Sequence, residues 1–259
     1  MGPAALRRLE KTSWVGCPAY LLEVIFFIHA RFFHTEADAN AEQPTMLFSS
    51  SFLPENSQPL QSPEALLQHI QAFDSIAWAI ELQTLLFLPD LTMRIALATT
   101  YKAAVYLYTS RVLSRPRAGS ISSSSANSSS FGLPPDHNAV AHILIHQLAV
   151  IPSQDPHFKC LIWPTFIAGA ECRDPSQRPF ILDRLSALYY AIATVNVRNA
   201  AWVLSLMWRK QDLRREQRQR QKWIGVSASA SGFNAECLDD NGFDWIQELD
   251  ESRIDWLFI

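Results

Sequence analysis

The stretch NAAWVLSLMW, residues 199–208, carries the clearest secondary-structure signal in this sequence. Its apolar residues recur at spacings of three, four, seven and eight, which places them on one face of an α-helix. The residues on that face are Ala200, Val203, Leu204, Met207 and Trp208. Asn199 is a predicted N-cap, because its side chain can accept a hydrogen bond from a free backbone N–H. The stretch therefore predicts a helix that begins near Asn199 and buries this face.

Helical spacing recurs through most of the chain. Further helices are predicted over residues 17–34, 62–88, 91–112, 137–150, 157–172 and 178–197. Pro63 after Ser62 and the residue Asp136 are predicted helix starts, and Pro164 predicts either a kinked helix or two short ones. No stretch combines a sustained period of two with flanking turn dipeptides. We expect an all-α fold, an irregular multi-helix domain.

Composition and breaks in the pattern predict the domain organisation. The 259 residues are 48% hydrophobic and 18% charged, with only 8 glycines, which argues against general disorder and against Gly-rich phosphate loops. Residues 1–224 are predicted to form a helical body with a flexible Ser-rich insertion at about 116–135. Residues 225–259 are predicted to hold a linker of small residues and an acidic, aromatic tail.

Charge, cysteine usage and hydropathy bear on the compartment. The net charge of −3 excludes a global positive field that would draw the chain onto nucleic acid or lipid. The four cysteines are scattered, which favours reduced thiols over a disulfide framework. The most apolar stretch, residues 18–33, is interrupted by Glu23, His29 and Arg31 and is too short to span a bilayer. We expect an intracellular protein with no membrane role.

Two groups of residues could suggest metal chemistry. His142 and His146 have ligand spacing on a helix, but the glutamate that a zinc protease places after the first histidine is missing, so an ordinary histidine pair is predicted. Asp239, Asp240 and Asp244 resemble the magnesium–diphosphate motif of helical terpene cyclases, but no second ligand set is visible. We predict no catalytic, cofactor-binding or metal-binding residue, and no enzyme.

A basic run follows the helix of residues 199–208. Three interpretations are compatible with it: a solvated helix end, a nuclear-targeting signal, and a contact to nucleic acid. The candidate residues are Arg209, Lys210, Arg214, Arg215, Arg218, Arg220 and Lys222.

The tail from Glu236 to Ile259 has eight acidic residues and one basic residue, and aliphatic and aromatic side chains interleave with them. One interpretation is that it docks on the helical body and buries its tryptophans. The other is a partner-binding segment of the acidic–hydrophobic type, in which charge keeps aromatic anchors exposed. The candidate partner contacts are Trp245, Trp256 and Phe258.

Several blocks together resemble a known family. They are WVGCP at 14–18, AAVYLY at 103–108, LIWPTFIAGAEC at 161–172, VRNA at 197–200 with Met207 and Trp208, and DWLFI at 255–259. In order and spacing they resemble the fungus-specific transcription factor domain, most closely the group of acriflavine sensitivity control proteins and arginine metabolism regulators. The resemblance implies an all-α regulatory domain of a nuclear transcription regulator, often tied to drug resistance or secondary metabolism.

Domains of this family commonly follow a zinc cluster, which needs six cysteines in close pairs. Because this sequence has four scattered cysteines, we expect a regulator without its own zinc cluster and do not expect direct contact with DNA. The expected partners are the transcription machinery or a zinc-cluster transcription factor, and a dimer is compatible with the pattern. The alternatives are a helical enzyme of secondary metabolism and a scaffold for an intact zinc-cluster factor.

Overall fold

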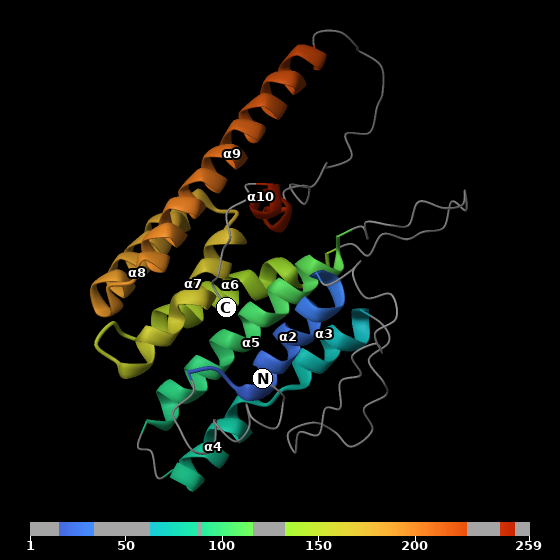
Figure 1. The fold of residues 1–259 in the computed structure, drawn as a ribbon. Helices are drawn as coiled ribbons and strands as arrows, with labels where there is room; N and C mark the ends of the chain where they lie inside the picture. The colour runs from blue at the N-terminus through green and yellow to red at the C-terminus, as the bar shows by residue number, and fades with distance from the viewer. Residues whose placement is uncertain (1–15, 34–62, 87–89, 116–132, 227–243, 252–259) are drawn as a thin grey trace.

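The computed structural model describes residues 16–33, 63–86, 90–115, 133–226 and 244–251, and these hold α-helices and two short 3₁₀ helices but no strand. The all-α prediction is confirmed. Figure 1 shows the arrangement, in which α9 is a long rod and α10 lies between α9 and the helices below it. In chain order the elements are α2 Ala19–Phe33, α3 Pro63–Ala72, α4 Ser75–Leu86, α5 Leu91–Leu113, α6 His137–Val150, η1 Pro156–Leu161, α7 Ile162–Ala170, η2 Pro175–Gln177, α8 Arg178–Ile192, α9 Val195–Val226 and α10 Trp245–Glu251.

Helix α5 is the centre of the fold, because α2, α3, α4, α6, α7 and η1 all contact it. Almost every residue from Ala96 to Leu113 is buried, so the helix is covered on all sides rather than along one stripe. Small side chains such as Ala98 and Ala104, which have no exposed surface, let neighbouring helices approach closely. Polar residues carried on such a helix must find partners inside the protein, since water cannot reach them.

The prediction of a single helix over residues 62–88 is wrong. Pro63 begins a helix as predicted, but the chain breaks after Ala72 and a second helix starts at Ser75. Asp74 causes the break, because its Oδ1 accepts hydrogen bonds from the N–H groups of Ile76 (2.9 Å) and Ala77 (3.0 Å). Lys102 of α5 completes the turn by donating from Nζ to the carbonyl oxygen of Phe73, 2.8 Å away.

Helix α6 begins at His137 as predicted, but Asp136 does not cap it with its side chain. The carboxylate of Asp136 instead accepts a hydrogen bond from the hydroxyl of Tyr106 (2.6 Å) and another from the amide of Gln71 (2.8 Å). These bonds tie the start of α6 to α5 and α3.

Pro164 lies in the first turn of α7, where a missing N–H leaves no helical hydrogen bond unmade. The second of the two expected forms, two short helices, is therefore the one that the structure has. Helix α7 carries Gly169, whose carbonyl oxygen accepts a 2.9 Å hydrogen bond from Nε1 of Trp208 in α9.

The boundary between α8 and α9 also differs from the prediction. Helix α8 ends at Ile192 because Ala193 adopts a left-handed conformation with φ of 56°, and α9 begins at Val195 rather than at Asn199. The predicted core face of α9 is confirmed, since its residues are buried as a group: Ala200, Val203, Leu204, Met207 and Trp208. The described helices include none long and apolar enough to cross a membrane.

Candidate functional site

The most buried charged cluster of the described structure is centred on Glu171, at the C-terminal end of α7. Arg111 of α5 forms two hydrogen bonds with its carboxylate, from Nε to Oε1 (3.0 Å) and from Nη2 to Oε2 (2.5 Å). Nε2 of His137 lies 2.9 Å from Oε2, and because an ionised carboxylate only accepts, this nitrogen is the donor. Nδ1 of the same ring lies 2.7 Å from the hydroxyl of Ser110.

The fourth donor to this carboxylate comes from the C-terminal helix. Nε1 of Trp245 donates a 2.6 Å hydrogen bond to Oε1 of Glu171. Each carboxylate oxygen therefore accepts two hydrogen bonds, and the donors belong to α5, α6 and α10. Burial alone would raise the pKa of Glu171, but the hydrogen bond from His137 and the charge and hydrogen bonds of Arg111 outweigh it and lower this pKa to about 2. Glu171 is thus a buried anion that holds three helices to the end of α7.

Aromatic rings enclose the indole of Trp245, which is 3% exposed. The ring of Phe166 meets it edge-on at a centroid distance of 6.0 Å, and Tyr108 lies tilted at 6.3 Å. Trp163 stands behind Tyr108, edge-on at 6.0 Å. Apolar burial fixes the indole and its N–H finds a partner, which is the arrangement that buried tryptophans require.

Basic residues of α9, together with Arg115, contact α10 and the residue before it. Glu248 of α10 forms ion pairs with Lys210 and, at 2.5 Å, with Arg214, both on α9. Asp244, just before α10, pairs with Nε of Arg115 at 3.1 Å. Burial opposes ionisation of Glu248, but the two cations lower the pKa of this carboxyl below its ordinary value. We call this surface the α10 seat, defined by Tyr108, Arg115, Phe166, Glu171, Lys210 and Arg214.

Residues of the predicted basic run have different surroundings in the structure. Lys210 and Arg214 hold α10, and Nη2 of Arg215 donates to the carbonyl oxygen of Arg173, 2.9 Å away. The remaining candidates lie along the same helix: Arg209 and Arg220 are exposed, Arg218 is half-buried, and Lys222 belongs to α9. Part of the run thus serves the fold, and its role in targeting or in binding nucleic acid stays a prediction.

Of the candidate partner contacts in the tail, the structure describes only Trp245. Trp245 is covered by the body of its own chain, which agrees with the docking interpretation for this residue. Trp256 and Phe258 lie outside the described residues, as do Asp239 and Asp240 of the acidic cluster. Asp244, the third member of that cluster, is engaged with Arg115.

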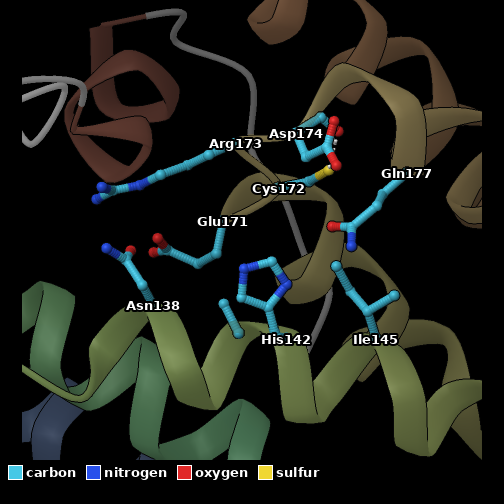
Figure 2. Close-up of a pocket in the computed structure, with 9 residues that line it drawn as sticks. Asn138, His142, Ile145, Glu171, Cys172, Arg173, Asp174 and Gln177 are labelled. Atoms are coloured by element: carbon cyan, nitrogen blue, oxygen red, sulfur yellow. Dashed lines mark hydrogen bonds between the residues drawn. The ribbon is translucent and has the colours of Figure 1, made fainter.

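An open pocket of about 290 Å³ lies beside Glu171 (Figure 2). Asn138, His142 and Ile145 rise into it from α6, and the turn from Glu171 to Gln177 closes the opposite side. His146 is exposed on the same helix. Within the described ranges, no three histidine, cysteine or carboxylate side chains converge as metal ligands would.

Sequence reasoning missed the centre of the site. Glu171, Arg111 and His137 were not among the candidate residues, although a signal for the first two exists. Each is a charged residue inside a long apolar block, Glu171 in LIWPTFIAGAEC and Arg111 in the last turns of α5. A charge in such a block has to be buried with a partner, so the two could have been proposed as a pair.

Comparison with known proteins shows which family this chain belongs to. The profile of the fungal specific transcription factor domain matches residues 8–259. The chain belongs to this family. The fungal specific transcription factor domain described here is also similar to the acriflavine sensitivity control protein acr-2 of Neurospora crassa, with 29% identity over 189 residues. That alignment takes in 71% of the present chain and 26% of the Neurospora protein, so the chain spans about a quarter of the relative that it matches. No solved structure matches it.

The block LIWPTFIAGAEC, one of those on which the sequence resemblance rests, supplies several residues of this site. Phe166 packs against Trp245, Trp163 packs against Tyr108, the carbonyl oxygen of Gly169 accepts the hydrogen bond from Trp208, and Glu171 is the buried anion. The block therefore contributes residues to the joint between α5, α6, α9 and α10.

Proposed function

We propose that this chain is the regulatory domain of a transcription regulator, acting in the nucleus, and that it controls transcription through contacts with a partner. The observation that carries the proposal is the match to the fungal specific transcription factor domain along residues 8–259. The proposed partners are the transcription machinery or a zinc-cluster transcription factor that supplies the binding to DNA. The gene set is proposed to serve drug resistance or secondary metabolism, and the name of the Neurospora relative, a control protein for acriflavine sensitivity, supports the former.

The geometry supports a mechanism that works through surfaces. The acidic helix α10 lies against the basic run of α9 in the α10 seat, where Glu248 pairs with Lys210 and Arg214. A partner that binds α10 would compete with its contacts to α9, and a partner that binds α9 there would displace α10. Binding at one helix is therefore coupled to the position of the other. We propose that control of transcription passes through this joint.

A reporter assay tests the proposed function. The full chain is fused to a foreign DNA-binding module and placed upstream of a reporter gene in a fungal cell. We expect activation or repression relative to the module alone, and a changed response for Glu248→Lys, which disrupts the joint. Glu216→Lys, on an exposed position of the same basic helix, is the matched control. A reporter that responds to neither the native chain nor the variants would overturn the proposal.

Localisation is tested separately. A fluorescent fusion of the full chain is expected in the nucleus, and the double substitution of Arg209→Ala with Arg220→Ala is expected to shift it towards the cytoplasm. Both residues are exposed, so the change spares the packing of α9. A native fusion excluded from the nucleus would contradict the proposal.

A further inference from the structure

The three residues that bring the C-terminal segment into the α10 seat are consecutive, and each does a different task. Asp244 accepts the backbone N–H of Ile246 at 3.0 Å, which caps α10, and pairs with Arg115. Trp245 fills the aromatic enclosure and bonds to Glu171. Ile246 is 4% exposed and completes the apolar contact. The α10 seat therefore binds an Asp-Trp-aliphatic sequence at the start of a helix.

The sequence contains this unit twice. Asp244-Trp245-Ile246 is followed by Asp255-Trp256-Leu257, and no other Asp-Trp pair occurs in the 259 residues. Each task has a matching side chain in the second unit: a carboxylate for the cap and for Arg115, an indole for the enclosure and Glu171, and a branched aliphatic residue for the apolar contact. An apolar residue precedes each unit, Phe243 the first and Ile254 the second.

We propose that the α10 seat is a recognition site for a helix that opens with Asp-Trp-aliphatic, and that Asp255-Trp256-Leu257 is an alternative occupant that competes with α10 for it. This inference concerns binding within the chain and does not depend on the proposed role in transcription. The seat holds one unit at a time, so the other unit is free to contact a partner while the first one closes the fold.

The residues that flank each unit determine which of the two occupies the α10 seat more often. Glu248, four residues after Asp244, adds the ion pairs with Lys210 and Arg214, whereas the corresponding position after Asp255 is Ile259. The longer connection from α9 to the second unit lowers its effective concentration by only about twofold. Because Lys210 and Arg214 are 58% and 44% exposed, their ion pairs favour α10 modestly and leave the exchange accessible.

Peptide binding to the full chain tests the proposal. The probes are fluorescein-labelled peptides of residues 241–251 and 252–259, and the proteins are the native chain, Trp245→Ala, Trp256→Ala and the double variant. In the native chain and in each single variant a tethered unit fills the seat, so fluorescence anisotropy should show weak binding. The double variant should bind both peptides at least tenfold more tightly. Peptides in which the tryptophan is replaced by alanine are the matched controls and should not bind.

Each contrary result is decisive. If the native chain binds the first peptide as tightly as the double variant does, α10 does not fill the seat. If the double variant binds the first peptide and not the second, or if Trp245→Ala alone binds as tightly as the double variant, the second unit is not a competitor. Circular dichroism of each protein verifies that its helices are intact.

Cross-linking of paired cysteines with a short bis-maleimide gives a second readout that does not need an empty seat. The full chain with Arg115→Cys and Asp244→Cys should cross-link, because the reagent spans the gap that the arginine side chain bridges in the native ion pair. The pair Arg115→Cys and Asp255→Cys should cross-link only when Trp245→Ala is also present, and peptide mass spectrometry identifies the cross-link. Absence of the 115–255 cross-link in the Trp245→Ala chain would overturn the exchange.

Discussion

The indole nitrogen of Trp245 donates a 2.6 Å hydrogen bond to the buried carboxylate of Glu171, which lies 74 residues earlier in the chain. Glu171 in turn is held by Arg111, 60 residues before it. One carboxylate thus joins the central helix, the end of α7 and the C-terminal helix. The consequences of removing it, titrating it or displacing its C-terminal partner differ, and each can be measured.

Replacing Glu171 by glutamine should destabilise the domain strongly. The substitution keeps the shape of the side chain but removes the negative charge that Glu171 places beside the guanidinium of Arg111, which is 5% exposed. Breaking a buried ion pair from one side costs about 3–5 kcal/mol. Urea unfolding should show this loss, whereas Asp183→Asn, at an exposed position of α8, should stay within about 0.5 kcal/mol of the native chain. A loss below about 1 kcal/mol for Glu171→Gln would show that the cluster does not hold the fold.

The same carboxylate should make stability depend on pH in acid. The pKa of Glu171 is lowered in the folded chain to about 2, from an ordinary value of 4.5. A lowered folded pKa means that the stabilisation is complete above about pH 4.5 and is lost as the pH falls towards 2. This shift corresponds to about 3 kcal/mol.

Measuring urea unfolding at several values of pH between 2 and 5 tests this window. Asp212 also has a lowered pKa, because Arg178 pairs with it, so the native chain alone does not isolate one group. The difference between the native chain and Glu171→Gln does. We expect the gap between their unfolding free energies to shrink as the pH falls, and parallel curves would refute the assignment.

Charge reversal at Glu248 should release α10 without unfolding the body. Glu248→Lys places a third cation beside Lys210 and Arg214, and the cost falls on the contact between α10 and α9. Because both partners are about half exposed, we expect a loss of about 1–2 kcal/mol. Hydrogen exchange should become faster at the amides of residues 246–251 and remain slow in α5.

A matched set of variants decides whether the effect comes from this contact. Glu216→Lys adds the same charge at an exposed position of α9 and should leave exchange in α10 unchanged. Combining Glu248→Lys with Lys210→Glu and Arg214→Glu restores opposite charges across the joint and should restore protection. Failure of the triple variant to do so would mean that Glu248 acts through something other than these two cations.

The sequence alone predicted the helices that are long and periodic, and it did less well where one residue ends an element. The buried face of α9 and the extent of α5 follow from apolar spacing, a property of neighbouring residues. The break at Asp74 depends on a side chain that competes with the backbone for N–H groups, and the end of α8 on an alanine in a left-handed conformation. Apolar spacing continues across both positions, so periodicity does not reveal them.

The candidate site was predicted in part for a related reason. The docking interpretation of the tail agrees with the burial of Trp245, and the basic run lies on a helix as expected. The cluster around Glu171 escaped because His137, Arg111 and Trp245 are 34, 60 and 74 residues away from it. Contacts over such separations are fixed by the packing of whole helices, which no local pattern contains.

The joint between α7 and α9 offers a last test, at Gly169. A Cβ at this position would lie 2.4 Å from Cδ1 of Leu204 and 3.1 Å from Cγ2 of Ile181, two side chains with no exposed surface. Glycine to alanine in a helix normally stabilises by up to about 1 kcal/mol, but the clash should reverse the sign and make Gly169→Ala destabilising by about 1–3 kcal/mol. Adding Leu204→Ala removes the clashing methyl groups, so in urea unfolding the double variant should lose less than the sum of the two single changes. Strict additivity would show that α7 and α9 are not in the close contact that the glycine permits.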